Sequence, residues 1–339
     1  MDCYKIHCFI IYKQFHQNMN IASVDIGTNT LLLVIGEYKT IKKTIFNAAD
    51  LVILNDFHSI ARLGEGVGRT GVISDEAFAR AAGILHHYKS LCDEHNVTLI
   101  KAVATSAVRD AQNGGSVCER LGAILNCEVH CITGEEEARL SFIGTSETGN
   151  LCTVIDIGGG STEYVTGENN TISHRMSLQI GAVRLHERFL LSLPPSPESI
   201  IAARKEIRRQ LALLPQAQAL SANGFASGDI IGVGGTFTTL AAIDLRLGEF
   251  DSARVHNHSL ILETVSRITN YLLTTPLPAL LENPAIHPQR ADILPAGALI
   301  LEETLLFFGA ASCKASIKGL RYGVLYDAFA QWFENNSKQ

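Results

Sequence analysis

The stretches Asp25-Ile-Gly-Thr-Asn-Thr30 and Asp156-Ile-Gly-Gly-Gly-Ser-Thr162 are two copies of one pattern, 131 residues apart (156 minus 25). Each copy follows an apolar run of the kind that forms a buried strand. A strand that ends in a carboxylate and then turns on glycine presents backbone N–H groups to whatever lies at the turn. Phosphate together with a divalent cation suits such a turn. The repeat therefore predicts two similar lobes, each with one phosphate-binding turn.

Size and composition predict a soluble globular protein of two domains. The chain has 339 residues, of which 46% are hydrophobic and 18% charged, and division into two domains is common at this length. The formal charge of −6 provides no general attraction for nucleic acid or anionic lipid. No apolar run reaches the roughly 18 residues of a membrane-spanning helix. The eight cysteines include no C-x-x-C pair, so we expect reduced thiols in a cytoplasmic protein.

The first 18 residues, MDCYKIHCFIIYKQFHQN, do not belong to the predicted fold. Their apolar run, Cys8–Tyr12, is too short for a signal peptide, and no cleavage site follows it. Met19 directly precedes the first predicted strand, so translation is expected to begin there. The alternative is a poorly ordered tail.

Strand-like and helix-like segments alternate along the first half, and this alternation predicts an α/β fold. The predicted strands are Ile21–Val24, Leu31–Ile35, Val97–Ala104 and Glu128–Ile132. The predicted helices run from Ser74 to Leu91, from Ala107 to Ala111 and from Val117 to Leu125. The first two strands flank the first turn, which is therefore expected at a hairpin.

The second half repeats the plan. Its predicted strands are Leu151–Ile157, Glu163–Thr166, Ile172–Leu178 and Ile230–Val233. Its predicted helices are Glu198–Leu213, Gly234–Leu245, Ser259–Leu273 and Pro295–Phe307, before a terminal segment at Ala315–Trp332. The boundary between the halves, near Leu140, is inferred from the repeat.

The second turn gives the strongest indication of a site. It contains three successive glycines and two hydroxyl residues: Gly158, Gly159, Gly160, Ser161 and Thr162. Asp156 and Glu163 lie on either side, where carboxylate oxygens suit a hard divalent cation. A bare hairpin is the alternative, but it needs one or two such glycines and no paired acids.

A third glycine-rich turn, formed by Gly234, Gly235 and Thr236, leads directly into a predicted helix. The free N–H groups and positive dipole at a helix start suit a second phosphate. This turn alone does not indicate a phosphate site, because many α/β proteins turn in this way. It gains significance because two other glycine-rich turns occur in the same chain. No G-x-x-x-x-G-K-[ST] loop occurs, which excludes a P-loop nucleotide enzyme.

Two charged residues near helix starts are candidates for the chemistry. Arg109 follows a strand, where its planar guanidinium group either binds phosphate or forms a surface ion pair with Asp110 or Glu119. Glu137 lies just inside a predicted helix, whose capping box explains the two acids before it. Glu137 is left either to act as a general base or to remain a solvated helix charge.

Six motifs occur in the order ASVDIGTNTLLLVIGE, VATSAVRDAQNG, ITGEEEARLSFIG, TVIDIGGGSTEYV, GVGGTFTTLAA and GLRYGVLYD. Together, from about Asn20 to Asp327, they resemble the exopolyphosphatase/guanosine pentaphosphate phosphohydrolase family, Ppx/GppA. The resemblance implies the α/β fold of the actin, sugar kinase and Hsp70 superfamily (ASKHA, ribonuclease H-like). Two actin-like domains would enclose an active-site cleft. We expect one domain over residues 19–138 plus about 318–339, and the other over 139–317.

The resemblance also implies roles for the candidate residues. Glu137 would be the base that activates water, Arg109 would contact the phosphate chain, and Asp156 and Glu163 would bind Mg²⁺. The phosphate-binding residues would be those of the three turns: Asp25, Gly27, Thr28, Asn29, Thr30, Gly158, Gly159, Gly160, Ser161, Thr162, Gly234, Gly235 and Thr236. The implied reaction is in-line attack of water on a terminal phosphoryl group of inorganic polyphosphate or guanosine pentaphosphate.

Other functions remain open at this point. One is an ATP-dependent phosphotransferase of the same superfamily, and another is a non-catalytic protein that binds polyphosphate or an alarmone. Longer family members append a helical domain that this sequence does not include, so processive digestion of long chains is not expected. Family members commonly dimerise, and a homodimer is expected here.

Overall fold

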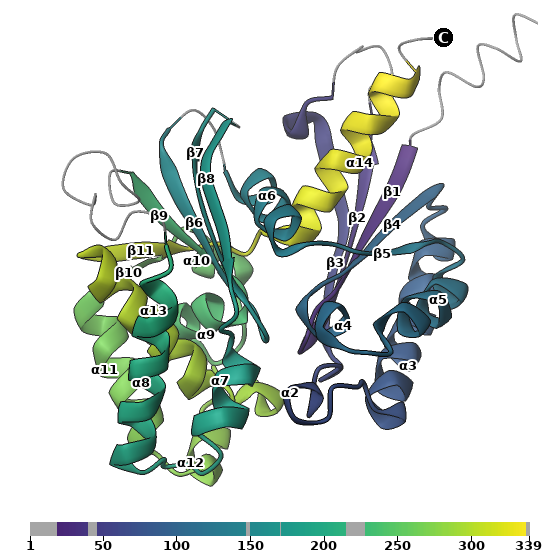
Figure 1. Cartoon of the computed structure of the whole chain (residues 1–339). Helices are drawn as coiled ribbons and strands as arrows, with labels where there is room; N and C mark the ends of the chain where they lie inside the picture. The colour runs from purple at the N-terminus through teal and green to yellow at the C-terminus, as the bar shows by residue number, and fades with distance from the viewer. Residues whose placement is uncertain (1–18, 40–45, 147–149, 170, 215–227, 337–339) are drawn as a thin grey trace, which may run out of the picture.

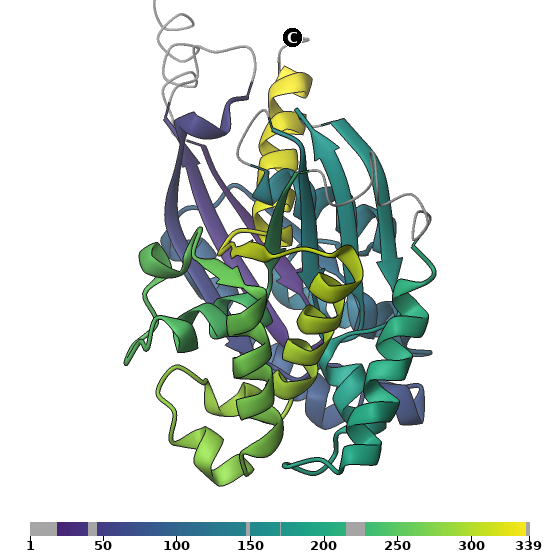
Figure 2. The same ribbon diagram turned by 90° about the vertical axis from the view of Figure 1, so that its left-hand side faces the viewer.

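The computed structural model describes residues 19–39, 46–146, 150–169, 171–214 and 228–336. Residues 1–18, where a tail or a later translation start is expected, lie outside this range. Within it, the chain forms two β-sheets that stand side by side, each with its own helices (Figures 1 and 2). The last helix, α14 (Leu320–Asn336), returns to the first sheet.

The first sheet has the strand order β3-β2-β1-β4-β5. Its strands are β1 (Met19–Ile26), β2 (Thr30–Tyr38), β3 (Leu51–Ile60), β4 (Leu99–Ala104) and β5 (Val129–Cys131). β1, β2 and β3 are antiparallel, whereas β4 runs parallel to β1 and β5 to β4. Alternate side chains point to opposite faces. Ala22 and Val24 thus pack with α3 (Asp75–Glu94) and α5 (Gly114–Leu125), while Ile21 packs with α14.

The second sheet repeats this order and adds a strand, giving β10-β11-β9-β6-β7-β8. Its strands are β6 (Cys152–Ile157), β7 (Thr162–Glu168), β8 (Thr171–Leu178), β9 (Asp229–Val233), β10 (Ser259–Ile261) and β11 (Ser312–Ala315). Again the first three strands, β6, β7 and β8, are antiparallel, whereas β9 runs parallel to β6 and β11 to β9. Each repeated glycine turn follows the first strand of its sheet. The sequence repeat is therefore a repeat of topology.

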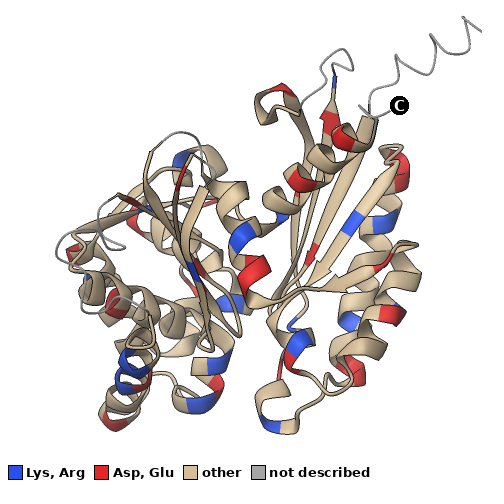
Figure 3. Cartoon of the chain, turned by 45° about the horizontal axis from the view of Figure 1, so that its top comes forward, with Lys and Arg blue, Asp and Glu red and all other residues tan. Residues whose placement is uncertain are grey.

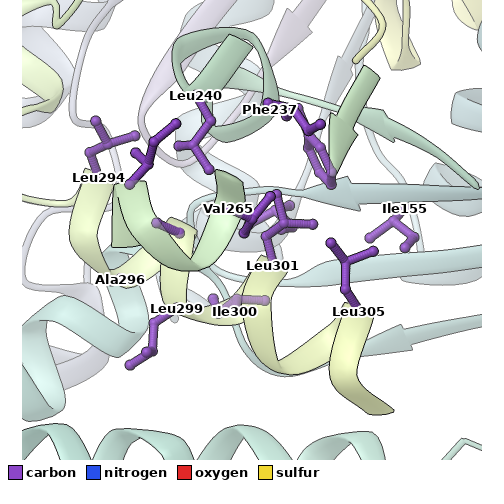
Figure 4. Close-up of a cluster of buried hydrophobic side chains, with 14 of the residues drawn as sticks. Ile155, Phe237, Leu240, Val265, Leu294, Ala296, Leu299, Ile300, Leu301 and Leu305 are labelled. Atoms are coloured by element: carbon purple, nitrogen blue, oxygen red, sulfur yellow. The ribbon is translucent and has the colours of Figure 1, made fainter. Parts of the chain in front are cut away.

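Helices cover both faces of the second sheet. Helix α6 (Gly134–Thr145) packs on one face through Ala138 and Phe142. The core on the other face contains α8 (Pro197–Leu211), α9 (Gly235–Asp244), α11 (Leu262–Thr274) and α13 (Leu294–Phe308). Figure 4 shows α13 side chains such as Leu301 gathered with residues of α9, α11 and β6. Helix α13 is buried almost all round and mostly apolar, and its two acids, Glu302 and Glu303, pair with Arg204 of α8.

The two halves meet through helices α6 and α14, which lie between the sheets (Figure 1). Their backbones touch: a Cβ atom at Gly323 would lie 1.8 Å from the carbonyl oxygen of Leu140. Only glycine permits this approach, so α14 holds α6 at a fixed position between the sheets.

The predicted α/β fold is confirmed, with local corrections. The helix predicted from Ser259 begins only at Leu262, because residues 259–261 form β10. The sequence patterns predict neither β3 nor β11. β10 and β11 are short and pair with each other across about 50 residues of chain, so no local period indicates them.

The remaining helices are short connectors. They are α2 (Val67–Thr70), α4 (Ser106–Asp110), α7 (Ala182–Phe189), α10 (Ser252–Val255) and α12 (Leu277–Leu281), with single 3₁₀ turns at Ala48–Asp50 and Pro288–Arg290. Acidic and basic side chains are interspersed over both halves (Figure 3). Within the described ranges, no helix is both long and apolar enough to cross a bilayer. The cysteines of these ranges are free thiols.

Candidate active site

A cavity of about 760 Å³ lies between the two sheets, and all three glycine-rich turns contribute to its wall. The predicted residues that line it are Asp25, Gly27, Thr28, Asn29, Thr30, Glu137, Asp156, Gly158, Gly159, Gly160, Ser161, Gly234, Gly235 and Thr236. Three predicted residues, Arg109, Thr162 and Glu163, lie behind this lining. The structure therefore places most of the predicted site around one space.

The first turn connects β1 to β2 and depends on glycine. The Gly27 N–H donates to the carbonyl of Thr30 at 3.1 Å. A Cβ atom at Gly27 would lie 2.8 Å from that same oxygen. Beside this turn, Asp25 is 7% exposed, and its Oδ1 atom has no hydrogen-bond partner among the described residues. Because buried polar atoms are normally paired, Oδ1 is available to a ligand.

The second turn connects β6 to β7 and faces the first. The Gly158 N–H donates to the carbonyl of Ser161 at 3.0 Å. A Cβ atom at Gly159 would lie 2.7 Å from Cβ of Thr28, which belongs to the first turn. The glycines thus allow the two turns to approach across the cavity. Thr162 contributes no side chain here, since its hydroxyl donates to the carbonyl of Ile180 at 2.6 Å.

The third turn precedes α9 and lies against the second. Gly234 has a φ of 96°, a conformation that favours glycine. A Cβ atom at Gly234 would be 3.3 Å from Oδ1 of Asp156, and one at Gly235 would be 2.0 Å from Nη1 of Arg290. The turn therefore brings the N-terminal end of α9 close to both a carboxylate and a guanidinium group.

Four acids gather beside the turns: Asp25, Glu137 and Glu163 are buried, and Asp156 is half-buried. Burial is the largest cause that raises the pKa of each one. Repulsion adds to it, because Glu137 and Asp156 both raise the pKa of Asp25 and of Glu163. The surroundings of these four carboxyl groups therefore favour their protonated, neutral forms.

Glu137 has the most informative surroundings of the four. It lies in the first turn of α6, where Thr133 caps the helix by accepting from the Glu136 N–H at 3.2 Å. Glu136 pairs with Arg139, whereas Glu137 turns into the cavity and is 7% exposed. Burial raises the pKa of Glu137 to about 7, against the opposing charge of Arg109. The expectation of a solvated helix charge is therefore wrong for Glu137.

Arg109 orients Glu137 from behind the cavity wall. Its Nη1 donates to Oε2 of Glu137 at 3.1 Å and to the carbonyl of Ile132 at 2.8 Å. Its Nη2 is buried without a partner in the described ranges. The alternative surface ion pair with Asp110 or Glu119 is not formed: Arg109 pairs with Glu137, and Asp110 pairs with Arg184.

Asp156 and Glu163 are the candidate ligands for a divalent cation. They are directly opposite in the β6–β7 ladder, so their side chains share one face. Asp156 Oδ2 accepts from Ser141 and Glu163 Oε1 from Ser177, each at 2.7 Å, while Glu163 Oε2 has no partner among the described residues. Within the described part of the chain, no three His, Cys, Asp or Glu residues form a complete metal cluster. Mg²⁺ fits this arrangement, because it commonly takes one or two carboxylates and completes its shell with water and substrate oxygens.

Sequence reasoning missed a basic wall of the cavity, formed by His58, His287, Arg290 and Arg321. Arg290 is nearly enclosed and donates to the Thr30 hydroxyl at 3.2 Å. Burial, helped by the charge of Arg321, lowers the pKa of Arg290 to about 10. Arg321 is neutralised by two bonds to Asp56, at 2.8 and 2.9 Å. The sequence gives no local signal for this wall, because its residues come from distant parts of the chain.

The cavity also has an apolar end. Leu247, Phe250, Pro284, Ala285, Ile286 and Ile293 contribute to it. Phe250 is 56% exposed, an unusual state for a large aromatic side chain. The lining of the cavity thus combines acids, glycine turns, basic groups and apolar side chains.

The two sheets of like topology and the cavity where the turns converge define an actin-like α/β fold with a candidate active site between its two halves. The Ppx/GppA phosphatase family matches residues 44–331 of this chain. The chain belongs to this family, and the membership supports a phosphate-releasing hydrolase activity.

Individual relatives are similar over most of the chain. Exopolyphosphatase 2 of Mycobacterium tuberculosis is 35% identical over 301 residues, which cover 84% of this chain and 89% of the relative. A crystal structure of an exopolyphosphatase from Cytophaga hutchinsonii has a TM-score of 0.81 at 27% identity, covering 94% of this chain and 98% of that one. The Ppx/GppA family member of Aquifex aeolicus has a TM-score of 0.74 at 29% identity, covering 93% and 99%.

Proposed function

We propose that this protein is a Mg²⁺-dependent hydrolase that releases orthophosphate from the end of inorganic polyphosphate. The observation that carries the proposal is Glu137, a buried carboxylate with a pKa of about 7 at a cavity where three glycine turns converge. A base with a pKa near the working pH is well matched to accept a proton from water. The similarity to an exopolyphosphatase supports the choice of substrate.

In the proposed reaction, water attacks the terminal phosphorus in line with the bridging oxygen. One P–O bond forms while the bond to the bridging oxygen breaks, Glu137 accepts a proton from the water, and the shortened chain leaves with the bridging oxygen. Arg109 fixes the orientation of the Glu137 carboxylate through Nη1. Its unpaired Nη2 is a candidate donor to the substrate.

The turns and the basic wall bind the anion. Backbone N–H groups of the three turns would hold phosphoryl oxygens, where negative charge develops in the transition state. Asp156 and Glu163 would hold Mg²⁺, which when bound supplies positive charge next to those oxygens. Arg290 and His58 line the path that the remainder of the anion would take.

Guanosine pentaphosphate is a second candidate substrate. It presents the same phosphoanhydride to the turns, and its nucleoside requires an apolar surface. The apolar end of the cavity, with the exposed ring of Phe250, favours this candidate.

The test is phosphate release by the purified full chain from polyphosphate and from guanosine pentaphosphate, with Mg²⁺ and with excess EDTA. We expect Mg²⁺-dependent release from at least one of them. The matched control is Glu135→Gln, because Glu135 lies on the same helix with a side chain that is 69% exposed. Its turnover should equal that of the wild type. Absence of release from both substrates would overturn the hydrolase.

The same assay separates the other functions. ADP formation that requires an added acceptor would identify a phosphotransferase, and binding without turnover would identify a sensor. We also propose the domain division at residues 19–138 with about 318–339, and 139–317. The homodimer and the cytoplasmic location stay predictions.

A further inference from the structure

Helix α7 holds the carbonyl groups of the second glycine turn. The N–H groups of Ala182 and Val183 donate to the carbonyls of Gly158 and Gly159, at 2.9 and 2.8 Å. The Arg184 side chain continues the series, since its Nε donates to the carbonyl of Gly160 at 2.7 Å. Three successive carbonyls of the turn are therefore directed at α7.

This arrangement fixes the direction in which the N–H groups of the turn point. In a trans peptide the C=O and the N–H of one unit point in opposite directions. The carbonyls of Gly158, Gly159 and Gly160 all point to α7. The N–H groups of the same three peptide units therefore point away from α7, towards the cavity that the three glycines line. Gly181 makes the contact possible, because a Cβ atom there would lie 2.5 Å from the backbone of Gly159.

Arg184 also contacts the other half of the molecule. Its Nη2 donates to the carboxylate of Asp110 at the end of α4, and the two side chains are 25% and 31% exposed. The residue before Asp110 is Arg109, which binds Glu137. The Arg184 guanidinium group thus joins the turn of the second sheet to the short helix that orients Glu137.

We infer that Arg184 is a positioning residue, which keeps the phosphate-binding turn in register with the Arg109–Glu137 pair. The inference rests on the proposed function for its effect on turnover. Arg184 does not line the cavity, so it acts through the turn and through Asp110. The planar fork of arginine presents Nε and Nη2 to the two acceptors in a fixed geometry, which the single ammonium group of lysine does not reproduce.

The experiment compares Arg184→Ala and Arg184→Lys with Arg188→Ala. Arg188 lies one turn further along α7 and is 55% exposed, with a 3.7 Å ion pair to Glu206 and its guanidinium group 5.1 Å from the centre of the Phe189 ring. Because turn N–H groups act mainly on charge that develops in the transition state, Arg184→Ala should lower kcat about 10- to 100-fold and raise KM less than about threefold. Arg184→Lys should stay impaired although its charge is kept. Arg188→Ala should equal the wild type.

Hydrogen exchange supplies a readout that does not need activity. Peptides that cover residues 156–164 and 104–111 should exchange faster in Arg184→Ala and not in Arg188→Ala. Asp110→Asn leaves the bond from Arg184 to Gly160 in place, so it should speed exchange less than Arg184→Ala does. This variant replaces Arg184→Ala in the test if Arg184→Ala does not fold. Unchanged exchange at residues 156–164 overturns the inference, and so does faster exchange with unchanged kcat and KM. If the wild type itself is inactive, the proposed function is overturned. The hydrogen-exchange comparison still shows whether Arg184 holds the turn at residues 156–164.

Discussion

Replacing Glu137 by glutamine removes a charge and little volume from the centre of the site. The pKa of Glu137 is raised from 4.5 to about 7, chiefly by burial. The folded state therefore holds its proton more tightly than the unfolded chain does. The stability associated with this proton is present below pH 4.5 and is lost as the pH rises through 7. Each pKa unit corresponds to about 1.4 kcal/mol, so ionised Glu137 destabilises the fold by about 3 kcal/mol above pH 7.

Urea unfolding at several pH values, in EDTA, measures this difference. Glu137→Gln should become more stable than the wild type as the pH rises from 4.5 to 7, and the difference should level off near 3 kcal/mol. In the activity assay with Mg²⁺, the same variant should lose at least 100-fold in kcat, since general bases contribute about 10² to 10⁴. The kcat/KM of the wild type should rise with pH through about 7.

Two results would refute this reasoning. A stability difference that does not change between pH 5 and pH 8.5 would mean that Glu137 titrates normally. Turnover equal to the wild type would remove its role as the base. The exposed control, Glu135→Gln, should change neither stability nor activity.

Three further predictions concern the cavity wall. Asp156→Asn should raise the half-saturating Mg²⁺ concentration about 10- to 100-fold, and an unchanged Mg²⁺ titration would exclude it as a ligand. Gly159→Ala places a Cβ atom 2.7 Å from Cβ of Thr28 and should lower kcat/KM more than about tenfold, whereas Gly115→Ala, with no atom within 4 Å, should be fully active. Arg290→Met should raise KM for polyphosphate about tenfold with a smaller change in kcat; an unchanged KM would separate Arg290 from the anion path.

The repeated turns were predictable because their chemistry is local. A carboxylate, a run of glycines and flanking hydroxyls occupy adjacent positions, so the sequence alone indicates both Asp25 and Asp156. Their arrangement around one cavity follows from the repeated sheet topology, since each turn follows the first strand of its sheet. The fold class was predictable for the same reason.

The contacts that tune the site were not predictable, because they join distant segments. Arg290 reaches Thr30 across 260 positions, and Arg109 reaches Glu137 across 28. Neither pair leaves a periodic pattern in the sequence. The raised pKa of Glu137 likewise depends on burial by both halves of the chain, which no local motif reports.

The central claim is that water, activated in this cavity, attacks the terminal phosphoryl group. Turnover of polyphosphate in water enriched in oxygen-18, followed by mass spectrometry of the products of a single cleavage, tests it directly. The account predicts one labelled oxygen in the released orthophosphate and none in the shortened chain. Label in the shortened chain, or orthophosphate without label, would contradict the account.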